Sequence, residues 1–173
     1  MNAVALEAVV ETSRQEVEQG LETMLARLWR FALTQCGDHA VADDLVQSTC
    51  IRALERADQF ESGSRLDSWL YSILISIWRN TTRANAVRRG AGLVEIADAH
   101  LESTAAEGES KVQVAQVLKA IAALPEGQSS VMLLVCVEGM SYAEAAQSLQ
   151  IPIGTVMSRL STARKAILAL KSS

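Results

Sequence analysis

The chain has 173 residues, of which 49% are hydrophobic and only 4% aromatic, and its formal net charge is −4. This length suits one medium-sized domain or two small ones, and so much apolar content excludes global disorder. The charge is unevenly placed, because residues 63–92 and 151–173 each carry a net charge of +4 in an otherwise acidic chain. Charge placement matters more than the total for a DNA partner, so the acidic total does not exclude nucleic-acid binding.

The sequence offers little material for catalysis or metal binding. Cys36, Cys50 and Cys136 are odd in number and widely spaced, which excludes a disulfide framework and predicts no metal site. The chain has no glycine-rich phosphate loop and no nucleophile–base pair, so we predict no catalytic residue, no cofactor and no enzymatic activity. An acidic N-terminus and a longest apolar run of 131–137 predict a cytoplasmic protein without membrane insertion.

Apolar spacing in the first half predicts helices with clear stop and cap signals between them. The predicted elements are a leader over 1–13, helices over 14–35, 39–57 and 66–82, and a basic tail from Arg79 to Arg89. Gly37 ends the first helix and Asp38 can cap the second. The third helix is apolar on more than one face, which predicts a central position.

The second half predicts four short helices after an acidic stretch without helical pattern. The predicted elements are a linker over 91–110 and helices over 111–124, 127–138, 142–149 and 152 to about 170. Ser141 and Glu144 have capping-box spacing, and Pro152 suits a first helical turn. A structureless stretch as long as the linker is unusual inside one domain. We therefore predict an all-α protein with two small helical domains, 14–90 and 111–173, joined by a flexible acidic linker.

Residues 141–165 are typical of a helix-turn-helix, with a short capped helix, a tight turn and a basic second helix. The free amides at Gly154 and Thr155 can meet a phosphate. The outer positions of the second helix are Met157, Ser158, Arg159, Ser161, Thr162 and Lys165. Such a helix can lie in a major groove, although a helical hairpin with a solvated basic face fits the same pattern.

Two segments resemble one family. Residues 124–167 resemble the −35-reading domain of extracytoplasmic-function (ECF) sigma factors, through Leu124-Pro125-Glu126, the capped segment from Gly139 to Glu144, and Gly154 to Arg159. Residues 43–78 resemble the core-binding and DNA-melting segments of the same family. The chain is identified as resembling the ECF subfamily of sigma-70-type RNA polymerase sigma factors.

The resemblance implies a role for each of three residue sets. The set expected on the β′ clamp helices of core RNA polymerase is Asp43, Asp44, Leu45, Val46, Gln47 and Arg52. The set expected at the −10 element is Phe60, Trp69, Tyr71, Ser76, Arg79, Asn80, Arg83, Arg88 and Arg89. The set expected at the −35 element is Gly154, Thr155, Met157, Ser158, Arg159, Ser161, Thr162 and Lys165.

Simpler interpretations stand beside several of these roles. Phe60, Trp69 and Tyr71 could be core residues. Asp43 and Asp44 could simply stabilise the N-terminus of a helix, without any docking role. Some residues depart from the family pattern, so the resemblance does not predict which promoter sequence the chain reads. These residues are Ser48, Cys50, Ser76, Asn80, Met157 and Thr162.

The resemblance implies core RNA polymerase, promoter DNA and a dedicated anti-sigma factor as partners. Two alternatives remain at this point. One is a stand-alone helix-turn-helix regulator, which leaves the motif from Asp44 to Gln47 unexplained. The other is a sigma mimic that sequesters an anti-sigma factor, which should have lost the basic residues that both DNA-facing stretches retain.

Overall fold

The computed structural model of the chain describes residues 3–88 and 109–171. Every regular element in these ranges is helical, which confirms the predicted all-α class. The elements in chain order are α1 (Ala3–Cys36), α2 (His39–Glu55), the 3₁₀ turn η1 (Ala57–Gln59), α3 (Leu66–Arg88), α4 (Glu109–Ala122), α5 (Glu126–Met132), the π-helical turn η2 (Leu133–Val137), α6 (Tyr142–Leu149) and α7 (Ile153–Lys171).

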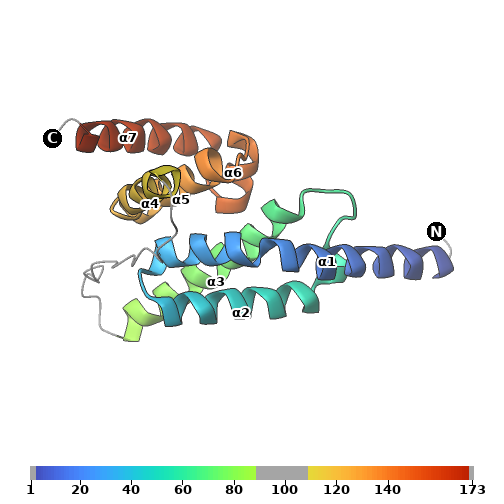
Figure 1. Ribbon diagram of the computed structural model, residues 1–173. Helices are drawn as coiled ribbons and strands as arrows, with labels where there is room; N and C mark the ends of the chain where they lie inside the picture. Colours follow the sequence, from blue (N-terminus) through green and yellow to red (C-terminus); the bar gives the residue numbers. More distant parts are fainter. Residues whose placement is uncertain (1–2, 89–108, 172–173) are drawn as a thin grey trace.

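The helices form two groups that lie against each other (Figure 1). Helices α1, α2 and α3 run alongside one another, and α4 to α7 form the second group, in which α7 lies farthest from the first in this view. The groups touch mainly where α6 packs on α3 and where α4 and α5 approach α1. The predicted linker, 91–110, falls outside the described residues except at its last two positions, which begin α4. The exact domain boundaries stay a prediction.

The break between α1 and α2 confirms two predictions, the helix stop at Gly37 and the helix cap at Asp38. Gly37 has φ +69°, a left-handed conformation that glycine adopts without strain, and its N–H donates to the Leu33 carbonyl at 2.8 Å. The Asp38 side chain accepts a hydrogen bond of 2.9 Å from the Val41 N–H and so caps α2. Two adjacent residues therefore reverse the chain and place α2 against α1.

Other boundaries differ from the prediction. The expected leader is part of α1, which begins at Ala3, because residues 3–13 contain no glycine or proline to interrupt a helix. Helix α3 runs on to Arg88 instead of ending near 82. The helix expected over 127–138 loosens after Met132 into the π-turn, where the Glu138 N–H bonds the Leu133 carbonyl at 2.9 Å.

The buried apolar side chains form one hydrophobic cluster that extends through both groups of helices. In the first, Phe31 of α1 and Tyr71 of α3 place their ring centroids 5.1 Å apart at an interplanar angle of 54°. Side chains buried around this pair include Leu28, Leu70 and Leu74. In the second group the buried side chains include Ile121, Val131, Leu134, Leu149, Val156 and Leu160. Each such side chain contributes about 1.5–3 kcal/mol by leaving water, so packing is the main source of stability.

Candidate polymerase and nucleic-acid interfaces

The outward face of α2 combines charged and apolar side chains. Asp43, Asp44 and Gln47 are exposed, as predicted for a docking helix, and Arg52 is half-buried. Apolar side chains follow the same face: Val41, Ile51 and Leu54 are exposed at 40%, 52% and 39%. Exposed apolar groups beside charged ones are the composition expected of a surface that another protein covers.

Two predicted docking residues do not belong to this face. Leu45 and Val46 are exposed at only 5% and 8% and pack in the core. Val41 and Leu54, apolar residues of the same helix, are exposed at 40% and 39%. The sequence signal was ambiguous here because apolar residues occur on both sides of α2, and the positions of α1 and α3 decide which side is covered.

Asp43 is tied to the neighbouring helix. The Trp29 indole N–H donates to the Asp43 carboxylate at 2.7 Å, and the Trp29 ring meets the His39 ring edge-on with centroids 5.3 Å apart. This contact fixes the orientation of Asp43, whereas no hydrogen bond or ion pair is found for the Asp44 side chain among the described residues. Sequence reasoning missed Trp29, and no motif marks it.

Helix α3 presents the polar part of the predicted −10 set along one face. Ser76 and Arg79 are half-buried, and Asn80 and Arg83 are exposed. Their spacing of three, one and three residues keeps them together on one side of a helix. Arg88 is the last residue of α3, and Arg89 lies outside the described residues. Trp78, which is not among the named −10 residues, lies half-buried between the two groups of helices.

The aromatic part of the −10 set is mostly in the core. Phe60 is 3% exposed and Tyr71 0%, while Trp69 is half-buried with its ring centroid 5.3 Å from that of Phe60. The Tyr71 hydroxyl is buried without a hydrogen-bond partner among the described residues. Burial, followed by the nearby Glu138 charge, raises the pKa of Tyr71. Phe60 and Tyr71 thus have a packing role here, and a base contact by either ring would require it to leave the core.

The helix-turn-helix is built as the sequence predicts. Ser141 and Glu144 form the complete capping box: the Ser141 hydroxyl accepts from the Glu144 N–H at 3.2 Å, and the Glu144 carboxylate accepts from the Ser141 N–H at 2.7 Å. These hydrogen bonds lower the pKa of Glu144. Gln150 makes the turn with a left-handed φ of 50°, and the Pro152 carbonyl accepts from the Thr155 N–H at 2.9 Å as α7 begins.

Replacing Ser141 by alanine should lower the free energy of unfolding by about 1 kcal/mol, because the Glu144 N–H loses its acceptor. Urea denaturation followed by circular dichroism measures the change. Ser64→Ala, at an exposed loop position, is the control and should change the same quantity by less than about 0.5 kcal/mol. Equal effects of the two substitutions would show that the cap contributes nothing.

Helix α7 separates an inward from an outward face. Val156, Leu160 and Ala163 are buried at 0%, 1% and 0% exposure. The predicted −35 residues on the outward face are Gly154, Met157, Ser158, Ser161, Thr162 and Lys165, all exposed, with Thr155 half-buried at its edge. A β-carbon at Gly154 would have nothing within 4 Å, so a phosphate could approach the helix start. This face could lie along a major groove.

Arg159 is the exception in the −35 set. It is half-buried, and its guanidinium lies over Gly127, where an added β-carbon would come within 2.9 Å and the flexible arginine side chain would have to shift. Arg159 lines a cavity of about 220 Å³ between the two groups of helices, together with Trp78 and Arg79 of α3. One residue of the predicted −35 set and one of the −10 set therefore line the same partly open pocket.

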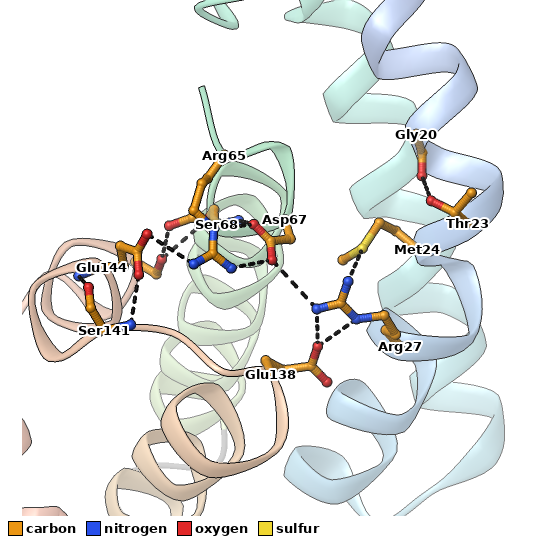
Figure 2. Close-up of polar contacts among 11 residues, drawn as sticks. Gly20, Thr23, Met24, Arg27, Arg65, Asp67, Ser68, Glu138, Ser141 and Glu144 are labelled. Carbon is orange, nitrogen blue, oxygen red and sulfur yellow. Dashed lines mark hydrogen bonds and ion pairs between the residues drawn. The ribbon is translucent and has the colours of Figure 1, made fainter. Parts of the chain in front are cut away.

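A network of charged side chains crosses from the first group of helices to the second (Figure 2). Arg27 of α1 bonds the Glu138 carboxylate through Nε at 2.6 Å and lies 3.5 Å from the Asp67 carboxylate. Arg65 donates to Asp67 at 2.7 Å and to Glu144 at 3.0 Å. Two arginines of the first group thus bind one glutamate each in the second.

Hydrogen bonds extend this contact to either side. The hydroxyl oxygens of Ser68 and Ser148 lie 2.9 Å apart. The Ser130 hydroxyl donates to the Gln35 side chain at 2.7 Å, and the Trp78 indole N–H donates to Glu126 at 3.0 Å. Polar contacts therefore join α1 and α3 to α5 and α6.

The pKa shifts in the network follow from these pairings. Burial would lower the pKa of Arg27, but the hydrogen bond to Glu138 and the Glu138 charge outweigh it and raise the pKa. Burial would raise the pKa of Asp67, but the hydrogen bonds from Arg65 and the Ser68 N–H lower it below its ordinary value. The ionised Asp67 therefore stabilises the fold above its unfolded-state pKa of about 3.9, and this contribution is lost as the pH falls through its lower folded-state pKa.

The three cysteines are free thiols. Cys36 and Cys50 are half-buried and burial raises the pKa of both thiols, while Cys136 is exposed. Across 3–88 and 109–171, no group of three or more His, Cys, Asp and Glu residues is placed to hold a metal ion. Nor does any helix in the described part of the chain combine the length and apolar character that crossing a bilayer requires.

Comparisons with known proteins agree with this organisation. The family described as sigma-70 region 2 matches residues 21–88, and sigma-70 region 4 matches residues 115–167. The chain is 36% identical over 143 residues to the ECF RNA polymerase sigma factor EcfG of Rhodopseudomonas palustris (strain TIE-1), covering 81% of this chain and 76% of that protein. It is 31% identical over 172 residues to SigC of Mycobacterium tuberculosis (strain CDC 1551 / Oshkosh), covering 97% and 84%.

A solved structure is similar over nearly the whole chain. It is the sigma factor RpoE in complex with the anti-sigma factor NepR from Bartonella quintana, with a TM-score of 0.76 and 29% identity over 91% of this chain and 98% of that one. The two family matches define a sigma-70-type transcription initiation factor. Within that class, the chain belongs to the ECF RNA polymerase sigma factor family. The region 2 match also accounts for the half of the chain that a stand-alone regulator would leave unexplained.

Proposed function

We propose that this sigma factor directs core RNA polymerase to its promoters through three separate surfaces. The outward face of α2, with Asp44 and Gln47 at its centre, docks on the β′ clamp helices. The polar face of α3, from Ser76 to Arg83, meets the −10 element, and the outward face of α7 enters the −35 major groove.

The observation that carries this proposal is the exposure of α7. Its outward side chains lie on an intact helix-turn-helix, opposite the buried Val156 and Leu160, while the α2 face is exposed on the other group of helices. Phosphate contacts from basic residues would set the register, and short polar side chains would read base edges. The polymerase supplies the chemistry, so the chain needs no catalytic residue or cofactor, and it acts in the cytoplasm.

We also propose an anti-sigma factor as a partner. The similar Bartonella quintana sigma factor is seen in complex with one, and the present chain offers the same helical fold. Co-purification of the full chain with proteins of its own cell should recover a small protein that blocks transcription when added back. If none of the co-purified proteins lowers the transcription rate when it is added back, the proposal of an anti-sigma partner is refuted.

The function is tested by run-off transcription with core polymerase on a library of genomic fragments. Promoter-specific transcripts should appear only when the chain is added, and their start sites should share a −10 and a −35 element. Folded protein that fails to bind core polymerase would contradict the proposal.

Lys165→Ala should weaken transcription about 3–10-fold at every promoter alike, because a phosphate contact carries no sequence information. The slope of log affinity against log salt concentration for a duplex carrying the −35 element should fall by about 1. Lys119→Ala, which removes an exposed lysine from α4, is the matched control and should change neither quantity. A loss at some promoters only would instead assign Lys165 to base reading.

A further inference from the structure

Two arginines from different groups of helices line one pocket. Arg79 of α3 and Arg159 of α7 border a partly open space of about 220 Å³, and both residues are half-buried. Among the described residues, neither guanidinium forms an ion pair or a hydrogen bond, whereas Arg14, Arg27 and Arg65 each bind a carboxylate. The pocket therefore holds two positive charges that no described carboxylate pairs with.

Unpaired positive charges in a partly shielded pocket are unfavourable for two reasons. Burial removes part of the water around each guanidinium, and two like charges repel more strongly there than in bulk water. A bound anion offsets both effects. Each guanidinium presents its N–H groups as a planar fork, which matches the oxygens of a carboxylate or a phosphate. The pocket therefore has the chemistry of an anion site.

The charge and the volume of the pocket narrow the class of anion. A phosphate monoester carries about −1.5 to −2 charges at pH 7 and three acceptor oxygens, enough for both guanidinium forks, whereas a carboxylate carries a single charge. The volume of about 220 Å³ is about seven times the share of one water molecule in the liquid, so an organic group fits beside the phosphate. Ile75 and Leu149 supply an apolar wall for that group.

We propose that this pocket is a binding site for a small phosphate monoester, held by Arg79 and Arg159. The Glu126 carboxylate, which also lines the pocket, accepts the Trp78 indole N–H at 3.0 Å. Its negative charge opposes the phosphate and so limits the affinity. The proposal concerns a ligand of the chain without polymerase or DNA, and its failure would leave the sigma function untouched.

Isothermal titration calorimetry of the full chain with glycerol 3-phosphate, inorganic phosphate and acetate tests the proposal, with chloride holding the ionic strength constant. Glycerol 3-phosphate should bind at one site with a Kd of about 1 mM or lower. Inorganic phosphate, which lacks the organic group, should bind more weakly, and acetate at least about tenfold more weakly. If glycerol 3-phosphate does not bind at about 10 mM, or if either other anion binds as tightly, the proposal is overturned.

A matched pair of variants separates this site from the overall charge of the chain. Arg79→Gln/Arg159→Gln should weaken the binding of glycerol 3-phosphate at least about tenfold, because each guanidinium contributes charge-assisted hydrogen bonds. Arg83→Gln/Arg164→Gln removes the same charge from exposed positions on the same two helices and should change the Kd less than about twofold. Equal losses in the two variants would refute the site.

Glu126→Gln is a test that loss of folding cannot imitate, because this variant should bind more tightly. The amide oxygen can still accept the Trp78 N–H, while the negative charge beside the phosphate is removed, so the affinity for glycerol 3-phosphate should rise about 3–10-fold. Glu61→Gln, at an exposed loop position, is the control and should change the affinity less than about twofold. Unchanged or weaker binding by Glu126→Gln would show that the ligand does not lie in this pocket.

Discussion

Replacing both Asp44 and Gln47 by alanine should abolish promoter-directed transcription and leave the fold intact. Both side chains are exposed on α2, three residues apart, beside the exposed Ile51. Truncating central residues of a protein interface costs about 2 kcal/mol or more, so the affinity for core polymerase should fall at least about 30-fold. Fluorescence anisotropy with labelled chain measures the affinity, and run-off transcription measures the consequence.

The chain offers a matched control for this pair. Gln19 and Glu22 are also exposed, also three residues apart, and lie on α1. Gln19→Ala/Glu22→Ala should leave the affinity for core polymerase unchanged. In the absence of polymerase, the Asp44→Ala/Gln47→Ala variant should still bind a −35 duplex with the affinity of the parent chain. If DNA binding and polymerase binding fell together, the proposed separation of surfaces would be wrong.

Truncation of Tyr71 to alanine should lower the free energy of unfolding by about 3–5 kcal/mol, because it empties the centre of the α1–α3 core. The ring is fully buried against Phe31. A loss of this size lowers the melting temperature of a protein of this length by about 10 °C, measurable by calorimetry. Tyr71→Phe should be nearly neutral, because the hydroxyl has no hydrogen-bond partner among the described residues.

Tyr71→Leu distinguishes packing from base stacking. Leucine keeps an apolar side chain in the core but removes the ring that could stack on an unpaired base. If Tyr71 only packs, Tyr71→Leu and the matched Phe31→Leu should both retain promoter opening at temperatures where they are folded. Loss of opening in the first variant alone would show that Tyr71 leaves the core to contact the −10 element.

Much of the fold could be predicted because its signals are local. A cap such as Asp38 or the Ser141–Glu144 box acts within three residues, and the positive φ of Gly37 is a property of that residue and its neighbours. The sequence also carried the family resemblance, because the recognition-helix motif from Gly154 to Arg159 occurs within a few consecutive residues. The outward positions of α7 followed from helical spacing alone, with Arg159 as the exception.

The remaining features depend on which helices meet, and residue spacing within one helix contains no such information. Leu45 and Tyr71 are buried because α1 covers them, and Ile51 is exposed because no described element does. Arg27 and Glu138 are 111 positions apart in the chain, and neither belongs to a motif. Thus the sequence by itself determined the helices, their caps and the family, whereas only the tertiary structure decided which aromatic rings are core and that the two halves close on each other. The physical reason is range: capping and periodicity act over a few residues, while burial and the charge pairs between the two groups of helices exist only once distant segments have packed together.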